Sequence, residues 1–157
     1  MTENKNINKL VFAMFILLSC SVRADVKFGD WTVNDQGIAF TKASTHNGIA
    51  SALLYDAISP YLYVVNAKGS CDREGEIPST MIVEGKAVRA TINSKTISDN
   101  QGYMCGKYIY PSSDKGKEYM NRLFVENHTM TINGKTFSLN GSSAAKRYVD
   151  KMLKKAL

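Results

Sequence analysis

The chain has 157 residues, of which 44% are hydrophobic and 22% are charged, with 11 Gly and 3 Pro. This composition is that of one ordinary globular domain, and it excludes collagen-like, low-complexity and intrinsically disordered chains. The formal net charge is +6 at pH 7, and the chain holds only 2 His and 3 Cys, so composition by itself indicates no reaction.

An export signal is expected at the N terminus. Lys5 and Lys9 precede an apolar run from Leu10 to Leu18. This run is about half as long as a membrane-spanning helix and has the length of a signal-peptide core. No later segment is long and apolar enough to cross a membrane, so we expect no transmembrane segment in the mature chain.

Two processing sites compete after this run. Val22-Arg23-Ala24 resembles a small-x-small site and predicts cleavage before Asp25, whereas Leu17-Leu18-Ser19-Cys20 resembles a lipobox in which Cys20 carries a lipid. We favour the first site over lipidation, and both over an uncleaved anchor. Residues 1–24 are then a signal peptide, and residues 25–157 are a single exported domain that is periplasmic or secreted. Lipidation of Cys20 would instead give an outer-membrane lipoprotein.

Most of the mature chain consists of short apolar segments separated by turn residues, which is typical of a mainly β fold, an antiparallel sandwich or barrel. The expected strands are Lys27 to Asn34, Ile38 to Thr41, Ile49 to Ala57, Tyr61 to Val65, Met81 to Val83, Ala87 to Ile92 and Gly102 to Tyr110. Glu84-Gly85-Lys86 predicts a hairpin between two of them. The side chains expected in the core are Trp31, Val33, Ile82, Val88, Ile132 and Phe137.

The C-terminal part combines a hairpin with two helices. Residues 129–139 alternate apolar and polar side chains around Asn133-Gly134, which predicts two strands joined by a type I′ turn. Apolar residues at helical spacing after Ser112-Ser113-Asp114 predict a short helix at 115–124. Ser142 or Ser143 can cap a second, amphipathic helix that runs from Ala144 to about Lys155.

The cysteines agree with export. Removal or lipidation of Cys20 leaves Cys71 and Cys105, and neither lies in a C-x-x-C or a Cys/His metal spacing. In an oxidising compartment this pair predicts one disulfide, which would stabilise the fold by roughly 3 to 4 kcal/mol in the chain-entropy model. The alternative is a nucleophilic Cys105 with His128 as its base, which we disfavour because an exported thiol with a partner usually oxidises.

The excess positive charge lies in the last twelve residues. After cleavage before Asp25 the net charge is +4, and residues 25–145 are formally neutral, so the body of the domain has no basic stripe for nucleic acid. The basic residues of the terminal helix are Lys146, Arg147, Lys151, Lys154 and Lys155. We expect its apolar face to dock on the sheet; the alternative is that the whole helix lies on an anionic membrane or envelope polymer. In both arrangements these five residues are the candidate anionic-surface site.

Three segments together resemble a known family. They are Phe28-Gly29-Asp30-Trp31-Thr32-Val33, Gly102-Tyr103-Met104-Cys105, and the closing run Phe137-Ser138-Leu139-Asn140-Gly141-Ser142-Ser143-Ala144-Ala145. An exported domain with these segments resembles the invasion-associated locus B family of bacterial periplasmic or surface proteins. The resemblance implies a β-rich exported domain with a role in host interaction or in the envelope, and it transfers no catalytic residues.

No constellation in the sequence predicts a catalytic residue, a metal site or a cofactor. His46 and His128 lie in or beside turns without an acidic cluster near either, so we expect neither to bind a metal. Glu74 and Glu76 match a glycosidase pair only in composition, and we expect them in a solvated loop after Cys71.

The favoured function is therefore that of a non-catalytic binding or interaction domain of the bacterial envelope, involved in host colonisation or invasion. Its partner would be an envelope or host protein, or an anionic surface, and not a nucleic acid. The alternative is a small periplasmic inhibitor of a cell-wall hydrolase that acts through an exposed loop such as Asp72 to Pro78, followed by a periplasmic enzyme.

Overall fold

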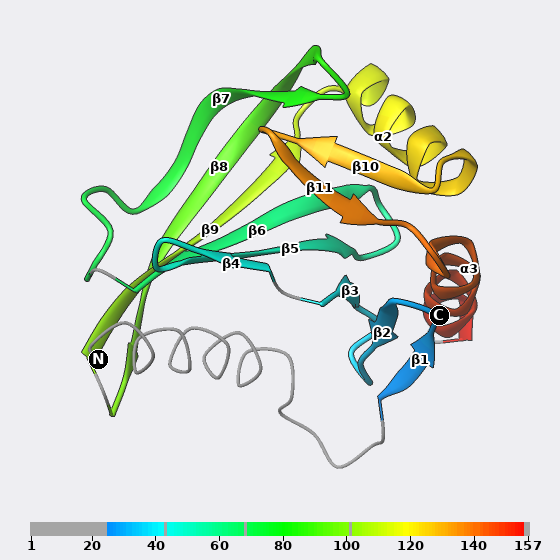
Figure 1. The fold of residues 1–157 in the computed structure, drawn as a ribbon, viewed down its shortest axis with the longest axis horizontal. Helices are drawn as coiled ribbons and strands as arrows, with labels where there is room; N and C mark the ends of the chain where they lie inside the picture. Colours follow the sequence, from blue (N-terminus) through cyan, green and yellow to red (C-terminus); the bar gives the residue numbers. More distant parts are fainter. Residues whose placement is uncertain (1–24, 43, 68, 101, 156–157) are drawn as a thin grey trace.

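The computed structural model describes residues 25–42, 44–67, 69–100 and 102–155 (Figure 1). The expected export signal, both processing sites and Cys20 lie in residues 1–24, outside the described residues. The strands are β1 (Val26–Phe28), β2 (Trp31–Val33), β3 (Ala39–Thr41), β4 (Ser44–His46), β5 (Ile49–Tyr55), β6 (Pro60–Asn66), β7 (Gly75–Val83), β8 (Lys86–Asp99), β9 (Gly102–Pro111), β10 (Thr129–Ile132) and β11 (Lys135–Ser138). The helices are α2 (Asp114–Glu126) and α3 (Ser142–Lys155).

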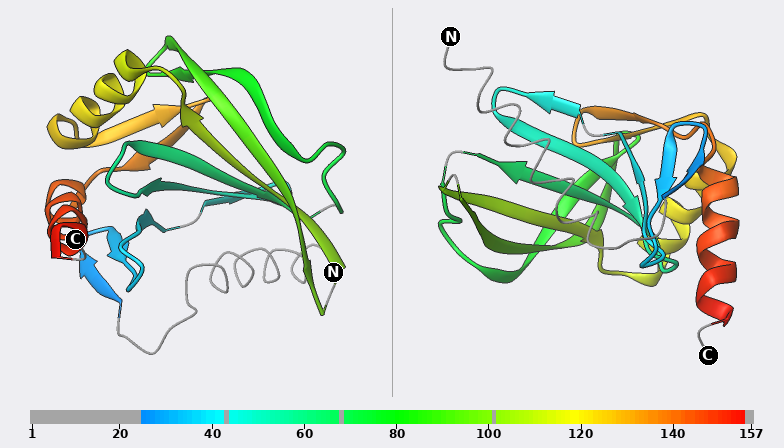
Figure 2. Two further views of the ribbon diagram at one scale, coloured as in Figure 1. Left: turned by 180° about the vertical axis from the view of Figure 1, so that it is seen from behind. Right: turned by 90° about the horizontal axis from the view of Figure 1, so that it is seen from below.

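One curled antiparallel sheet forms a half-barrel. Its strands follow the order β1-β2-β3-β5-β6-β9-β8-β7-β10-β11, and β4 pairs with β5 beside this path. Figures 1 and 2 show the long strands β8 and β9 running across the molecule and both helices gathered toward one end. The mainly β antiparallel fold predicted from the sequence is confirmed, and the curled sheet corresponds to the barrel rather than the sandwich.

The main core lies on the concave side of the sheet, against both helices and the β10–β11 hairpin. Phe124 of α2 and Ala145 and Val149 of α3 are fully buried there. The ring of Phe124 meets Trp31 edge-on, with centroids 4.8 Å apart, and stacks on Tyr55 with centroids 5.2 Å apart. The prediction that Trp31 is a core residue is confirmed.

Hydrogen bonds outside the strand ladders connect the two ends of the half-barrel. The Trp31 indole nitrogen donates to the Ser138 carbonyl oxygen over 3.2 Å, and the Ser138 hydroxyl donates to the Asp30 carboxylate over 2.6 Å. The backbone nitrogen of Asp30 donates to the carbonyl oxygen of Asn140 over 3.0 Å. These bonds hold the β1–β2 turn against the end of β11, and α3 begins directly after this junction.

The C-terminal elements follow the predictions. Asn133 and Gly134 have φ values of 49° and 77°, and two positive φ values are what a type I′ turn requires. Helix α2 begins after Ser113, whose hydroxyl accepts a hydrogen bond from the backbone nitrogen of Gly116. A Cβ on Gly116 would lie 2.9 Å from Cγ1 of Val88, so this glycine allows α2 to pack closely on the sheet.

Two predictions about strands are wrong. The segment 27–34 is not one strand, because the chain turns back at Gly29-Asp30 and places Phe28 opposite Trp31. Ile82 is not a core residue: it is 44% exposed, whereas its neighbours in β7 are buried. Side chains alternate between the faces of a strand, and three consecutive apolar residues at 81–83 leave the core-facing side undecided in the sequence.

A second apolar cluster lies on the convex face of the sheet. Side chains alternate along β5, so Ala50, Ala52 and Leu54 point away from the core that holds Leu53 and Tyr55. We call this second group the convex cluster; its buried members are Phe40, Ala50, Ala52, Leu54, Tyr63, Val65 and Met104. It spans β3, β5, β6 and β9.

Candidate functional site

Helix α3 is fixed to the sheet by its apolar side. Ala145 and Val149 are fully buried and Met152 is partly buried against the main core. Tyr148 packs its ring on Phe28 of β1, with centroids 5.4 Å apart. The expectation that the terminal helix docks on the sheet is confirmed. β1, β2 and β3 cover the apolar side of α3 in part, and Tyr148 and Leu153 stay 36% and 39% exposed.

Lys146 is only partly exposed, whereas the other four basic residues of α3 are exposed. Its Nζ donates to the Asp150 carboxylate over 2.7 Å and to the Tyr55 hydroxyl over 2.8 Å, and the Tyr55 hydroxyl donates to the other Asp150 oxygen over 2.8 Å. Burial acts to lower the pKa of Lys146, but the hydrogen bonds with Asp150 and Tyr55 raise it above its ordinary value. Burial is also the main cause that raises the pKa of Tyr55 to about 12.

The sequence indicates the contact between two members of this group, and the third member joins them only in the folded structure. Lys146 and Asp150 are four residues apart on one helix, a spacing at which opposite charges meet. Tyr55 comes from β5 and reaches them only because α3 docks there. The candidate anionic-surface site therefore has four exposed members, which we call the basic stripe: Arg147, Lys151, Lys154 and Lys155.

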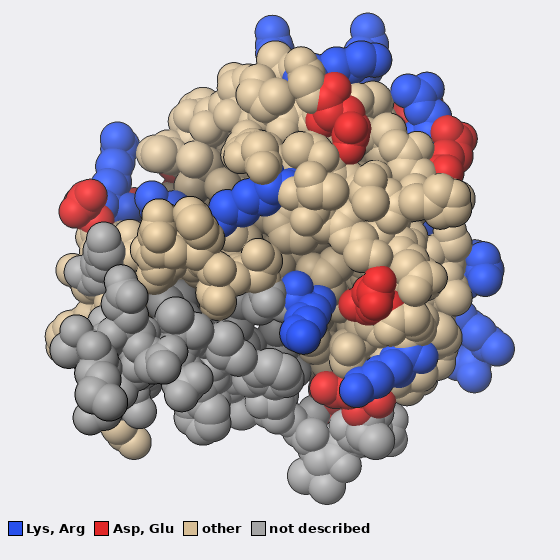
Figure 3. Space-filling view, viewed as in Figure 1, with Lys and Arg blue, Asp and Glu red and all other residues tan. Residues whose placement is uncertain are grey.

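The basic stripe follows the helical repeat. Arg147, Lys151 and Lys155 are spaced by four residues, so they line one side of α3 over about 12 Å, and Lys154 lies three residues after Lys151. None of the four forms an ion pair with a side chain in the described part of the chain. Figure 3 shows Lys and Arg at the rim and near the centre of one face of the molecule, with Asp and Glu among them, so no single sign of charge covers that face.

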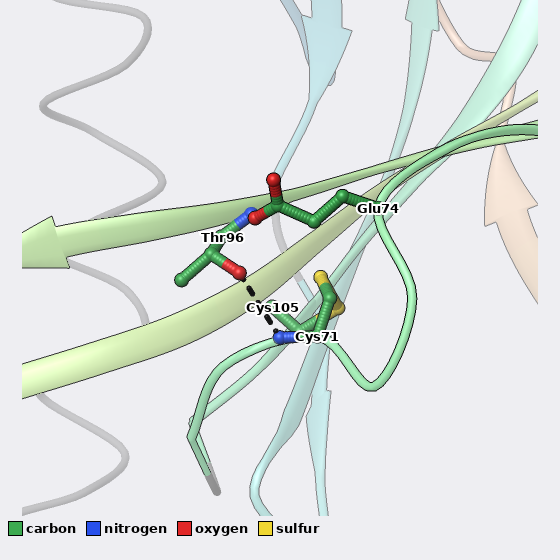
Figure 4. Close-up of a disulfide and its surroundings, with 4 residues drawn as sticks. All are labelled: Cys71, Glu74, Thr96 and Cys105. Atoms are coloured by element: carbon green, nitrogen blue, oxygen red, sulfur yellow. Dashed lines mark hydrogen bonds between the residues drawn. A yellow bond between two sulfur atoms is a disulfide. The ribbon is translucent and has the colours of Figure 1, made fainter.

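The predicted disulfide between Cys71 and Cys105 is confirmed. It joins the segment before β7 to β9, with Cα atoms 4.7 Å apart (Figure 4). The hydroxyl of Thr96 accepts a hydrogen bond from the backbone nitrogen of Cys71 over 3.1 Å, and the backbone nitrogen of Thr96 donates to the Glu74 carboxylate over 2.7 Å. Hydrogen bonds from Thr96 lower the pKa of Glu74. Cys105 is thus bonded to sulfur and is not a free nucleophile.

The two glutamates that follow Cys71 have separate hydrogen-bond partners. Glu74 is bound by Thr96, and Glu76 accepts a hydrogen bond from the Tyr110 hydroxyl over 2.7 Å. This bond is the main reason that the pKa of Tyr110 is raised. The expected loop from 72 to 78 is shorter than predicted, because Gly75–Val83 is strand β7, paired with β8. A hollow of about 230 Å³ lies beside the disulfide and is lined in part by Asp72 and Lys107.

His46 and His128 are both exposed, and neither lies near Cys71 or Cys105 in the sequence. His46 ends β4, and His128 precedes β10, where its carbonyl oxygen accepts a hydrogen bond from Leu139. Among the described residues, no three His, Cys, Asp or Glu side chains are grouped so that they could hold a metal ion. Neither helix of the described chain has the length and apolar character needed to span a membrane.

Comparisons with protein-family models, with curated proteins and with solved structures gave no match to this chain. The resemblance to the invasion-associated locus B family stays a prediction from sequence segments. The features that can support a function are therefore the basic stripe, the disulfide-anchored segment and the surface of the sheet.

Proposed function

We propose that this protein is a non-catalytic, exported protein of the bacterial envelope that adheres to anionic surfaces through the basic stripe of α3. The observation that carries the proposal is the orientation of α3, which buries its apolar side on the sheet and leaves Arg147, Lys151, Lys154 and Lys155 exposed. A helix fixed in this way presents its cations without a further cost of ordering the backbone.

Export is supported by the Cys71–Cys105 disulfide, because disulfides persist in oxidising compartments and are rare in the cytosol. The apolar run at 10–18 and the small-x-small site before Asp25 support cleavage to a periplasmic or secreted form. The resemblance to the invasion-associated locus B family supports a role in host colonisation or invasion.

The strength of the contact follows from the number of cations. A Lys or Arg near an anionic lipid surface contributes about 1 kcal/mol, so four of them contribute up to about 4 kcal/mol, or roughly a thousandfold in affinity. Salt screens this attraction, since the Debye length falls from about 30 Å at 0.01 M to about 8 Å at 0.15 M ionic strength. We therefore expect binding that weakens steeply as salt is added.

The test replaces the four members of the basic stripe by glutamine in one variant, R147Q/K151Q/K154Q/K155Q. The protein purified after export is mixed with vesicles of phosphatidylglycerol or of phosphatidylcholine, and bound protein is measured by co-sedimentation at low and at high salt. We expect the wild type to bind only the anionic vesicles at low salt, and the variant to lose most of this binding.

The matched control removes the same charge elsewhere. The variant K42Q/R89Q/K107Q/K115Q also replaces one Arg and three Lys, all exposed in the structure and all outside α3. It should keep most of the wild-type binding. Equal binding by the wild type and the basic-stripe variant, or equal losses in both variants, would contradict the proposal, because the effect would then be absent or would come from net charge alone.

A second candidate function, inhibition of a cell-wall hydrolase, is supported by the segment before β7. Asp72, Arg73 and Glu74 are exposed, while the disulfide of Cys71 and the hydrogen bond from Thr96 to Glu74 anchor the segment at both ends. A segment held in one conformation loses little entropy when it binds. Inhibition of a muramidase that is abolished by D72A/R73A, and kept by the basic-stripe variant, would establish this function instead.

A further inference from the structure

Two lysines lie on the concave face of the sheet, the face that carries the main core. Lys135 is on the same side of β11 as the buried Phe137, because residues two apart on a strand point to the same face. Lys107 shares a side of β9 with the buried Ile109 in the same way. Lysine is almost never buried without a charged partner, so both positions require a physical explanation.

The registers of five strands place Lys107 in a transverse row across the concave face. From β5 to β7, this row contains Ser51, Val64, Lys107, Ser94 and Gly75. We call it the polar row. The adjacent row toward α2, two residues away along each strand, contains Leu53, Leu62, Ile109, Ile92 and Ile77. All five of these are apolar, so the apolar lining of the concave face ends at the polar row.

Lys135 reaches the polar row from β11. Its Nζ donates a hydrogen bond to the hydroxyl oxygen of Ser51, which is fully buried. Lys135 is itself partly buried, and within the described part of the chain it forms no ion pair with Asp or Glu. An ammonium group that is partly removed from water without a counter-charge costs free energy. An anion bound beside Lys135 would remove this cost.

A hollow continues the polar row toward the disulfide. It has a volume of about 230 Å³, and its lining includes Lys107, Asn66, Cys71 and Cys105. The disulfide drawn in Figure 4 therefore forms part of its wall. Pockets for drug-sized ligands have volumes of about 300 to 1,000 Å³, so this hollow fits only a small compound.

We infer that the polar row and this hollow form a binding site for a small phosphorylated compound, whose phosphoryl group is held between Lys107 and Lys135. Ser51 and Lys107 are two strand spacings apart, which is about 10 Å. Both ammonium groups can approach one anion, because each is carried on a flexible four-carbon stem. The hydroxyl of Ser94, which is opposite Lys107 in the register of β8 and β9, can donate a further hydrogen bond.

The donors of this site favour a phosphoryl group over a carboxylate. Arginine binds carboxylates through its planar fork of donors, whereas lysine binds phosphate as a point charge. Both cations of the site are lysines, and no arginine lines the hollow in the described chain. Asp72 also lines the hollow, and its negative charge repels an anion. The phosphoryl group is therefore placed over the polar row, and the uncharged part of the compound is directed toward Asp72.

Calorimetric titration with glycerol 3-phosphate tests the site. The protein purified after export is titrated at low ionic strength in a buffer without phosphate. We expect the wild type to bind one molecule per chain, and the variant K107Q/K135Q to bind at least about tenfold more weakly, because it loses two charged donors. Absence of binding by the wild type, or unchanged binding by the variant, would overturn the inference.

The variant K95Q/K115Q is the matched control. It also removes two exposed lysines, and Lys95 directly follows Ser94 on β8 but points to the opposite face of the sheet. This control and the basic-stripe variant should both bind glycerol 3-phosphate like the wild type. A loss in either as large as in K107Q/K135Q would overturn the inference, because net charge or α3 would then be responsible. The outcome is thus independent of vesicle binding by the basic stripe.

Folding of the variants is verified by circular dichroism and by quantitation of the disulfide. If K107Q/K135Q does not fold, Lys107→Gln alone replaces it in the titration, because Lys107 is exposed and its loss leaves no cavity in the core. The single variant should also bind about tenfold more weakly. A folded Lys107→Gln protein with wild-type affinity would overturn the inference.

Two further titrations test the class of the ligand. Malate, a small dicarboxylate, should bind more weakly than glycerol 3-phosphate, and equal or tighter binding of malate would overturn the assignment to a phosphoryl group. The variant Asp72→Asn should bind glycerol 3-phosphate at least as tightly as the wild type, since it removes a repelling charge. Weaker binding by Asp72→Asn would overturn the placement of the anion, because Asp72 would then contribute an attractive contact.

Discussion

The indole nitrogen of Trp31 lies 3.2 Å from the carbonyl oxygen of Ser138 and donates a hydrogen bond to it, across 107 residues of sequence. Trp31 belongs to β2 and Ser138 to β11, which are near opposite ends of the strand order. Trp31 is fully buried and also packs its ring on Phe124 of α2. One side chain thus connects the first hairpin, the last hairpin and a helix.

Replacement of Trp31 by Phe keeps an aromatic ring but removes the indole N–H. The Ser138 carbonyl loses its donor and part of the core volume is left empty, so we expect the free energy of unfolding to fall by about 2 to 4 kcal/mol. Denaturant unfolding measures the change. Tyr103→Phe, at a ring that is 64% exposed, is the control and should change stability by less than about 0.5 kcal/mol. A Trp31→Phe loss as small as the control's would show that this junction does not hold the sheet.

The disulfide should contribute a large part of the stability. Cys71 and Cys105 are 34 residues apart, and in the chain-entropy model a bridge of this span stabilises a small domain by about 3 to 4 kcal/mol. We expect the C71A/C105A variant to unfold with a free energy about 2 to 5 kcal/mol lower than the wild type. Reductant should lower the stability of the wild type toward that of the variant and leave the variant unchanged. If labelling of denatured, unreduced protein finds two free thiols per chain, the prediction fails.

Gly141 should be the least replaceable glycine of the C-terminal part. It has a φ of +90°, and a Cβ there would lie 1.9 Å from the Phe28 carbonyl oxygen, so Gly141→Ala forces β1 and the start of α3 apart. We expect a loss of more than about 3 kcal/mol in the free energy of unfolding.

Gly134→Ala is the matched control for Gly141→Ala. Gly134 also has a positive φ, +77°, but nothing lies within 4 Å of its Cβ position. Only the strain of the left-handed conformation remains, which costs about 1 to 2 kcal/mol. The difference between the two variants therefore measures the close contact with Phe28. Equal losses would show that β1 moves aside without cost.

The Tyr55–Lys146–Asp150 group should make stability sensitive to alkaline pH. Burial raises the pKa of Tyr55 from 10.0 to about 12, so between these values the unfolded chain loses the phenol proton while the folded chain keeps it. The contribution that the raised Tyr55 pKa makes to the free energy of unfolding is complete below pH 10 and is lost as the pH rises toward 12. The raised pKa of Lys146 acts in the same direction.

The variant Tyr55→Phe isolates this effect, because it keeps the ring on Phe124 and removes the ionising group. Denaturant unfolding is measured for both proteins from pH 8 to about pH 12. Burial also raises the pKa of Tyr61 and of Tyr63, so these residues add their own alkaline loss of stability when the unfolded chain ionises. The relevant quantity is therefore the difference between the two stability curves. We expect the advantage of the wild type over Tyr55→Phe to shrink as the pH rises above 10; a constant difference would contradict the assignment.

The sequence by itself determined the local elements. Asn133-Gly134 fixes a hairpin because few other residue pairs adopt two positive φ values, and Ser113 marks the start of α2 because its hydroxyl can satisfy a free backbone N–H. The Cys71–Cys105 pair followed from elimination of Cys20 in an exported chain. These signals lie in the residues concerned or in their immediate neighbours, so they are readable without the fold.

The tertiary structure alone decided which partners those elements meet. The apolar residues at 81–83 could place either face of β7 inward, and only the packing of the sheet exposes Ile82. Lys146 belongs to a basic helix in the sequence, but the docking of α3 brings it to Tyr55 on β5 and removes it from the exposed basic stripe. The junction of Trp31 with Ser138 and the convex cluster likewise join residues far apart in the chain. Such contacts depend on the curvature and order of the strands, and residue patterns within a single strand or helix carry no information on either.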